Sequence, residues 1–253
     1  MSDDEPLAAL EAERRAVTAR GVGAGGSATV NDAATVVIVD RSGSEPRILM
    51  GLRGRAHVFM ANRFVFPGGR VDEADRHLAA TVSLPGPVSE RLLADVAPGF
   101  GPQEAAALTL AAVRETFEET GLVIGDAAAD RCPLPDAFAA FAEAGLGPAV
   151  APLVPVARAI TPEGAPRRFD TRFFALDAER FAPVPEVFAP PTDEFETIIW
   201  VSTSALDDFS LAPITRTVLD DVLARIADGS WLDPRRKMPF YRVIEGRFAR
   251  SLI

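Results

Sequence analysis

The 253-residue sequence contains one cysteine and is short of positive charge. Cys132 has no partner within the chain, so an internal disulfide is excluded and a reducing cytoplasm is the expected compartment. A single cysteine is more typical of a passive residue than of a nucleophile. The net charge of −10 argues against a general nucleic-acid binder, because such proteins carry basic surfaces.

The sequence also lacks a long apolar run. No run approaches the roughly 18–20 residues that a bilayer-spanning helix needs. The opening residues 1–5, M-S-D-D-E, are acidic, whereas a secretory signal begins with basic residues. We therefore expect no membrane association. Hydrophobic residues make up 48% of the chain, enough for a full core in one large domain or in a domain with additions.

The most informative stretch is 111–122, A-A-V-R-E-T-F-E-E-T-G-L, which is typical of the end of a helix. Gly121 is the residue type expected just after the last turn. At about 100° per residue, the carboxylates of Glu115, Glu118 and Glu119 share one face. Phe117 points the opposite way, toward a core.

Three carboxylates on one face at the end of a helix are unfavourable without a positive charge nearby. Like charges at these spacings repel by a few tenths of a kcal/mol per pair, and the helix dipole adds to that cost. Arg114 can reach Glu118 on the next turn. A divalent cation, Mg²⁺ or Mn²⁺, would offset more of the charge, since clustered carboxylate oxygens are its preferred ligands. An ordinary solvated acidic face is the alternative.

Upstream, residues 64–72 read F-V-F-P-G-G-R-V-D, a strand that runs into a glycine turn. Together with R-E-T-F-E-E-T-G-L at 114–122, this pattern resembles the signature of the Nudix hydrolases, in which a glycine and an acid precede R-E-aliphatic-x-E-E-x-G-aliphatic. Thr116 replaces the usual aliphatic residue, and Asp75 stands at the position of the first acid. Gly69 and Arg114 are 45 positions apart instead of 14, an insertion of 31 residues.

The resemblance implies a Nudix α/β/α sandwich with a mixed sheet, and hydrolysis of a diphosphate linked to another moiety. It implies Mg²⁺ or Mn²⁺ as cofactor, held by three carboxylates and one carbonyl: Glu115, Glu118, Glu119 and Gly69. Arg114 would orient the glutamates. The base would be one of those glutamates or an acid from a late loop, for which Glu194 and Glu196 are candidates.

Arginines gather around the glycine turn and recur on a later segment. Guanidinium groups match phosphate oxygens, so they are candidates for binding an anionic substrate, although surface solubility explains each one equally well. In R-F-D-T-R-F-F at 168–174 the charged side chains alternate with apolar ones, which favours either a shared substrate-facing side or a paired Arg–Asp ladder. The candidate substrate-binding residues are Arg53, Arg63, Arg70, Arg168 and Arg172. Arg55 belongs to the same cluster, and His57 fits a structural or substrate-contact role better than a proton shuttle.

A finer resemblance makes coenzyme A one candidate substrate. The split signature, the run V-F-M-A-N-R-F-V-F-P-G-G at 58–69 and the strand at 168–174 look like the coenzyme A diphosphatase branch related to the mammalian peroxisomal enzyme. Such an enzyme cuts coenzyme A or acyl-coenzyme A into 3′,5′-ADP and (acyl) 4′-phosphopantetheine. The coenzyme A motif of another branch is met at Arg53 but not at Gly51, Gly54, Val58 or Asn62. ADP-ribose, NADH or another nucleoside diphosphate derivative is the alternative, and a non-catalytic Nudix ligand sensor is a third reading.

The sequence predicts an N-terminal arm and linker over residues 1–28 and a hydrolase domain over 29–253. An insertion over about 76–103, with a helix at 89–96, should lie beside the active site, where it could shape substrate choice or a homodimer interface. The expected helices are 6–20, 103–120, 135–144 and 213–228. The expected strands are 34–40, 47–53, 150–160, 168–176, 197–201 and an edge strand at 240–244, with a strand beginning at 122–124.

Overall fold

The computed structural model describes residues 4–19, 29–54, 62–127 and 133–253. Cys132, Arg55 and His57 lie outside the described residues, so their roles stay predictions. The helices are α1 (Asp4–Ala19), α2 (Glu73–Ala79), α3 (Gly86–Leu92), α4 (Pro102–Thr120), α5 (Ala139–Glu143) and α6 (Pro213–Ala227). The strands are β1 (Val30–Asp40), β2 (Arg47–Arg53), β3 (Phe64–Val65), β4 (Gly68–Arg70), β5 (Gly125–Ala127), β6 (Leu146–Pro148), β7 (Val154–Ile160), β8 (Arg168–Asp177), β9 (Phe195–Ser202), β10 (Pro239–Ile244) and β11 (Arg247–Leu252).

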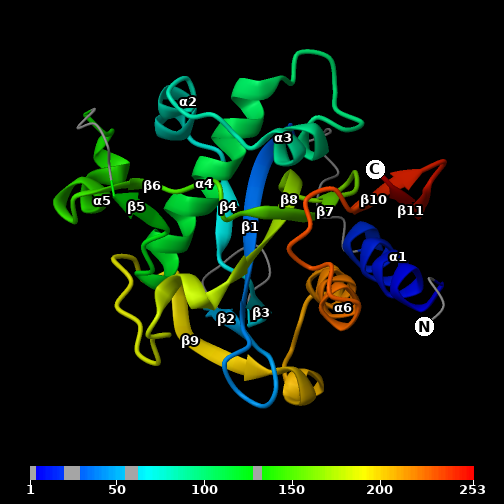
Figure 1. Cartoon of the computed structure of the whole chain (residues 1–253). Helices are drawn as coiled ribbons and strands as arrows, with labels where there is room; N and C mark the ends of the chain where they lie inside the picture. The colour runs from blue at the N-terminus through cyan, green and yellow to red at the C-terminus, as the bar shows by residue number, and fades with distance from the viewer. Residues whose placement is uncertain (1–3, 20–28, 55–61, 128–132) are drawn as a thin grey trace.

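The main sheet is mixed and runs in the order β11-β10-β7-β8-β1-β2-β3, with β4 paired to β1 and β9 paired to β2 (Figure 1). β1 is parallel to β8 on one edge. Its other edge is shared, because β4 pairs with Ala33–Thr35 and β2 pairs only with Val39 and Asp40. The β4 turn is thereby held against the first half of β1, facing α4.

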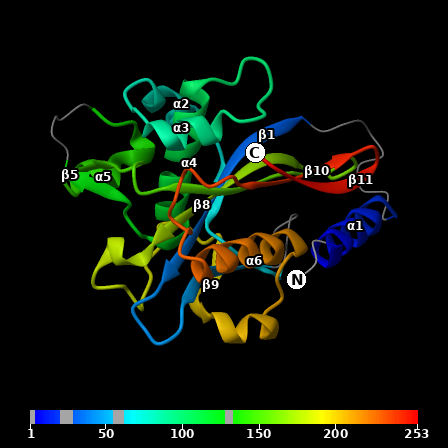
Figure 2. The ribbon, with the colours of Figure 1, turned by 45° about the vertical axis from the view of Figure 1, so that its right-hand side comes forward.

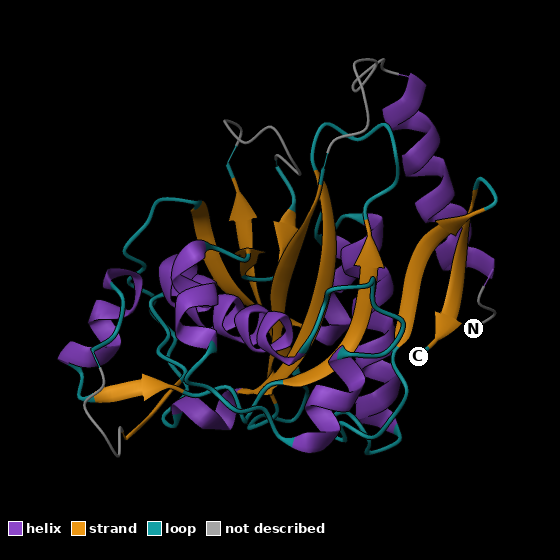
Figure 3. Cartoon of the chain, turned by 90° about the horizontal axis from the view of Figure 1, so that it is seen from above, coloured by secondary structure: helices purple, strands orange, loops and turns teal. Residues whose placement is uncertain are grey.

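Helices cover both faces of this sheet, as the view from above shows (Figure 3). Successive side chains of β1 point to opposite faces. Val36 and Ile38 enter a core that contains much of α4, whereas Val37 and Val39 enter a second core with α6. The predicted α/β sandwich with a mixed sheet is confirmed.

The N-terminal helix lies against the domain (Figure 2). Leu10 is buried in the same core as residues of α6, and Arg14 donates a hydrogen bond to the Gly246 carbonyl at the β10–β11 turn, 3.2 Å away. The helix predicted at 6–20 is confirmed, with bounds Asp4–Ala19. Among the described helices, none is both long and apolar enough to cross a membrane.

Some element boundaries differ from the expectation. The insertion helix is α3 at Gly86–Leu92 instead of 89–96, and α2 was not predicted, although Asp72 and Asp75 form a capping box at its start. The segment 122–124 has no regular structure. The strand 240–244 is confirmed but is wrong as an edge strand, because β11 pairs along its free side.

Candidate active site

The glutamates Glu115, Glu118 and Glu119 lie on the last turns of α4, and the helix ends as predicted. Gly121 has φ of 78°, a left-handed conformation that glycine adopts without strain, and its N–H donates to the Phe117 carbonyl at 2.7 Å. A Cβ there would lie 2.6 Å from the Ala189 carbonyl oxygen. The loop around Ala189 therefore packs directly on the end of the helix.

Arg114 is the centre of a buried hydrogen-bond network. Its Nε and Nη2 donate to both oxygens of Asp75, at 3.0 and 2.8 Å. Its Nη1 donates to Glu115 and to Glu118, each at 2.9 Å, so the predicted reach to the next turn is confirmed. Nη2 also donates to the Arg70 carbonyl at 3.0 Å, which ties α4 to β4. One guanidinium thus fixes two glutamates against the glycine turn.

Glu119 has different partners from its neighbours. Its Oε2 accepts the Gly68 N–H at 2.7 Å, and its Oε1 accepts Arg53 Nη2 at 3.4 Å. Its side chain is 1% exposed, against 12% for Glu115 and 31% for Glu118. The three carboxylates therefore form a gradient from the protein interior to its surface.

The glycine turn lies in contact with these carboxylates. A Cβ on Gly69 would lie 2.4 Å from the carboxyl carbon of Glu115. Any side chain at position 69 would displace Glu115, so glycine here permits the close approach of the β4 backbone to α4. The pairing of β4 with β1 fixes the turn in that place.

Burial makes the ionised form of each carboxylate unfavourable. It raises the pKa of Glu115 to about 7, although Arg114 opposes this shift. Burial also raises the pKa of Glu118, and raises the pKa of Glu119 well above its usual value against the Gly68 N–H and Arg53. Burial alone would lower the pKa of Arg114, but Asp75 and the two glutamates outweigh it and raise that pKa. Among the described residues, the four carboxyl groups of Asp75, Glu115, Glu118 and Glu119 contact only two guanidinium groups, those of Arg114 and Arg53.

Solved structures with a similar fold identify the architecture that carries this site. A NUDIX hydrolase from Alicyclobacillus acidocaldarius superposes with a TM-score of 0.53 at 24% identity, covering 80% of this chain and 85% of that one. The chain has the Nudix hydrolase fold. Two further solved structures superpose less well: the NUDIX domain of Shewanella oneidensis NrtR complexed with ADP ribose (TM-score 0.47, 11% identity, 89% of this chain and 99% of that one covered) and the Nudix hydrolase RenU from M. Smegmatis (TM-score 0.44, 15% identity, 80% and 95% covered). No protein-family model matches the sequence, and no curated protein matches it.

A divalent cation is the cofactor that the Nudix fold implies. Among the described residues, no group of three or more acidic, histidine or cysteine side chains is already arranged to hold a metal ion. The donor chemistry nevertheless fits a hard cation, since Arg114 takes only one oxygen from Glu115 and one from Glu118, which leaves a second oxygen on each. The raised pKa of these buried carboxylates also indicates a place where added positive charge would be stabilising.

The two candidate late acids lie in different surroundings. Glu194 Oε2 is 3.7 Å from Arg53 Nη2, and its charge contributes to the raised pKa of all three glutamates of α4. Glu196 lies instead beside Gly54, where an added Cβ would be 2.8 Å from its Oε1. Glu194 is therefore the acid that the structure brings to the cluster.

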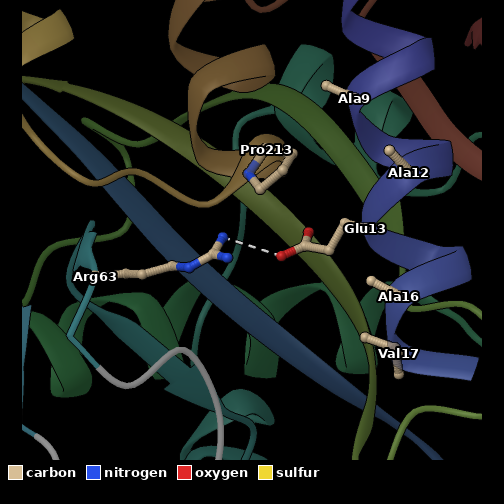
Figure 4. Close-up of a pocket in the computed structure, with 7 residues that line it drawn as sticks. All are labelled: Ala9, Ala12, Glu13, Ala16, Val17, Arg63 and Pro213. Carbon is tan, nitrogen blue, oxygen red and sulfur yellow. Dashed lines mark hydrogen bonds and ion pairs between the residues drawn. The ribbon is translucent and has the colours of Figure 1, made fainter. Parts of the chain in front are cut away.

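The arginines near the glycine turn also lie in different surroundings. Arg53 reaches the carboxylate cluster, and its Nε is buried without a hydrogen-bond partner among the described residues. Arg70 is exposed at the turn. Arg63 Nη1 binds Glu13 of α1 at 3.0 Å, beside a cavity of about 450 Å³ lined by alanines of α1 and by Pro213 (Figure 4).

The two arginines of β8 lie elsewhere in the sheet. Arg172 is 1% exposed, with Nη1 at 3.0 Å from Asp32 and 3.1 Å from Asp170, and its guanidinium stacks over Phe100. Arg168 Nε donates to the Thr161 carbonyl at 3.1 Å. Arg172 therefore belongs to an internal Arg–Asp network.

Two residues that support the site, Asp75 and Thr192, were not among the site residues predicted from the sequence. Asp75 holds Arg114 with both oxygens, and its position in the signature was the available signal. Thr192 Oγ1 donates to the Glu118 carbonyl at 2.7 Å, which holds the late loop on the end of α4. No sequence pattern pointed to Thr192, because the contact joins segments 74 positions apart.

Proposed function

We propose that this protein is a metal-dependent Nudix hydrolase that cleaves the diphosphate of a nucleoside diphosphate derivative. The observation that carries the proposal is the network in which Arg114 holds Asp75, Glu115 and Glu118 together beside Gly69. It joins the two halves of the interrupted signature in space, as a hydrolytic site would require. Every carboxylate that the signature assigns to the metal is present.

Each residue has a defined part in this proposal. Glu115, Glu118, Glu119 and the Gly69 carbonyl would hold Mg²⁺ or Mn²⁺. The bound metal supplies Lewis-acid activation of the diphosphate and lowers the pKa of the attacking water. Arg114, itself fixed by Asp75, keeps Glu115 and Glu118 in place.

The substrate would be bound and the water deprotonated by groups around that face. Arg53 and Arg70 are the arginines best placed to receive phosphate oxygens, because one reaches the carboxylate cluster and the other lies exposed on the turn. Glu194 is the candidate base from the late loop, with one of the α4 glutamates as the alternative. Its exposed carboxylate lies close enough to influence all three of them.

Coenzyme A or acyl-coenzyme A is the substrate we place first, on the sequence resemblance at residues 58–69 and 168–174. ADP-ribose and NADH come next, because each contains the same nucleoside diphosphate unit. The cytoplasm is the proposed compartment, on the single cysteine.

Product analysis with Mg²⁺ or Mn²⁺ tests the function. The panel is coenzyme A, acyl-coenzyme A, ADP-ribose, NADH and UDP-sugars, and Glu118→Gln is the inactive variant. Glu104→Gln is the matched control: it makes the same change on the same helix, at a residue that caps α4 through the Gly101 N–H. Release of 3′,5′-ADP from coenzyme A by wild type and control, but not by Glu118→Gln, supports the proposal. Cleavage of another compound in the panel would change the substrate assignment but keep the hydrolase proposal. If no compound is cleaved and no metal binds, a non-catalytic ligand sensor would be favoured.

A further inference from the structure

The segment after α6 passes α3 (Figures 1 and 2). Two arginines, one on each of these helices, hydrogen-bond to this segment. Arg91 of α3 donates Nη2 to the Arg235 carbonyl at 2.8 Å. Arg225, in the last turn of α6, donates Nη2 to the Lys237 carbonyl at 2.9 Å. Since the two carbonyls belong to one short segment, guanidinium groups from two helices converge on it.

Both guanidinium groups retain unused donors. Arg225 is 2% exposed, yet its Nη1 has no hydrogen-bond partner among the described residues, and the same holds for the buried Nε of Arg91. Among the described residues, each guanidinium group donates a hydrogen bond only to a neutral backbone carbonyl. Such an arrangement leaves buried N–H groups available to an acceptor that the chain itself does not provide.

The two acids whose charges act on Arg225, Asp221 and Asp228, are hydrogen-bonded to other partners. Asp221 accepts the Tyr241 hydroxyl and the Arg250 guanidinium. Asp228 accepts Arg236 and the Ser230 hydroxyl. Neither is hydrogen-bonded to Arg225 in the described structure, so its charge is balanced only at longer range.

A buried cation without a partner is unfavourable, and like charges add to the cost. The pKa of Arg225 is lowered to about 10, mainly by burial and also by the charges of Arg236 and Arg91, although Asp221 and Asp228 oppose the shift. Arg225 remains charged at neutral pH, so a bound oxyanion would offset the cost of burying its unpaired positive charge. The segment that supplies these carbonyls contains the basic run R-R-K at 235–237, in a chain of net charge −10.

We propose that Arg91, Arg225 and the 235–237 segment bind a phosphate-type oxyanion at a site separate from the α4 carboxylates. Guanidinium N–H groups approaching from two helices suit an anion with several oxygens. The separation follows from the sheet. α3 packs beside β7, whereas Arg53 and Gly69 lie on β2 and β4, and β8 and β1 stand between the two sites. The ligand would join the insertion helix α3 to the end of α6.

Thermal unfolding of metal-free protein tests this site, with inorganic phosphate compared against chloride at equal ionic strength. Removing the metal keeps phosphate from the acidic face of α4. Wild type should gain about 3 to 5 °C at phosphate concentrations roughly ten times the dissociation constant. Arg216→Ala, a partly exposed arginine in the first turn of α6 paired with Asp220, is the control and should keep the gain.

Arg225→Met and Arg91→Ala should lose the phosphate-dependent gain. In phosphate-free buffer Arg225→Met should be at least as stable as wild type, because it removes an unpaired buried charge while keeping the volume. If Arg225→Met does not fold, the phosphate-dependent change in the melting temperature of Arg91→Ala tests the proposal alone. No gain in wild type over chloride, or a gain kept in Arg91→Ala, overturns the proposal. A larger gain with AMP than with phosphate would assign the phosphate to a nucleotide, and an equal gain would assign it to free phosphate.

Discussion

Two buried networks of arginines and carboxylates lie in the same sheet sandwich, and they differ in charge balance. Around Arg114, one guanidinium serves three carboxylates, and Glu118 at its edge is 31% exposed. Around Arg172 and Arg158, two guanidinium groups serve Asp170 and Asp32. The first network has unneutralised negative charge that reaches solvent, and the second is neutral.

The neutral network also has its faces closed. Arg158 stacks over Phe240 at 4.2 Å, and Arg172 stacks over Phe100 at 4.7 Å. Asp170 accepts both Arg158 Nε and Nη2, at 2.9 and 2.7 Å. A balanced and covered network stabilises the sheet, whereas an unbalanced and open one can bind a cation. The predictions below break or sharpen that distinction.

The largest effect is expected on catalysis at the unbalanced network. Glu118→Gln removes a proposed metal ligand while keeping its volume, so hydrolysis should fall more than about a hundredfold. The melting temperature without metal should stay the same or rise, because one of the like charges is gone. The measurement is initial rate and thermal unfolding together, with Glu104→Gln as reference. Full activity in Glu118→Gln would contradict the assignment.

The next effect separates stability from activity. Asp75→Asn and Asp170→Asn each leave a buried arginine poorly paired and should cost about 3 to 5 kcal/mol in unfolding free energy. Only Asp75→Asn should also reduce kcat, by about 10- to 100-fold, because Arg114 orients the glutamates. Urea unfolding and kcat per folded molecule give both numbers. Equal losses of kcat in the two variants would remove the distinction.

A smaller effect distinguishes the late acids. Glu194→Gln should lower kcat about tenfold, because Glu194 lies beside the cluster, and the matched change Glu196→Gln should alter it by less than about twofold. Steady-state kinetics with saturating Mg²⁺ compares the two. The reverse order would place the functional acid at Glu196.

The smallest effect concerns α1. Glu13→Ala removes a half-exposed ion pair with Arg63 and should cost less than about 1 kcal/mol in unfolding free energy. Leu10→Ala should cost more, about 2 to 4 kcal/mol, because Leu10 is buried. Urea unfolding of the two variants checks the order. A larger loss in Glu13→Ala would show that the ion pair, and not packing, holds α1.

Helix geometry explains how much of the site could be predicted from the sequence. The shared face of Glu115, Glu118 and Glu119, the reach of Arg114 to Glu118 and the cap at Gly121 follow from 3.6 residues per turn and from glycine's freedom. The structure confirms the reach of Arg114 to Glu118 and the cap at Gly121. Local spacing was sufficient because the contacts are local.

The placement of Arg172 could not be predicted in the same way. Strand alternation shows which side chains share a face, but not which segment covers that face. Phe100, from the insertion, covers Arg172, and the path of an inserted loop has no periodicity to read. Glu194 and Glu196 could not be separated for the same reason. Their surroundings depend on how the loop before β9 packs against Arg53 and Gly54.

Calorimetric titration of Mn²⁺ into metal-free protein tests the central claim most directly. The unbalanced network around Arg114 should bind Mn²⁺ in wild type, in Glu104→Gln and in Asp170→Asn with the same affinity. Glu118→Gln should bind at least about tenfold more weakly. Equal affinity in Glu118→Gln, or no binding in wild type, would contradict the claim that this face of α4 is a metal site.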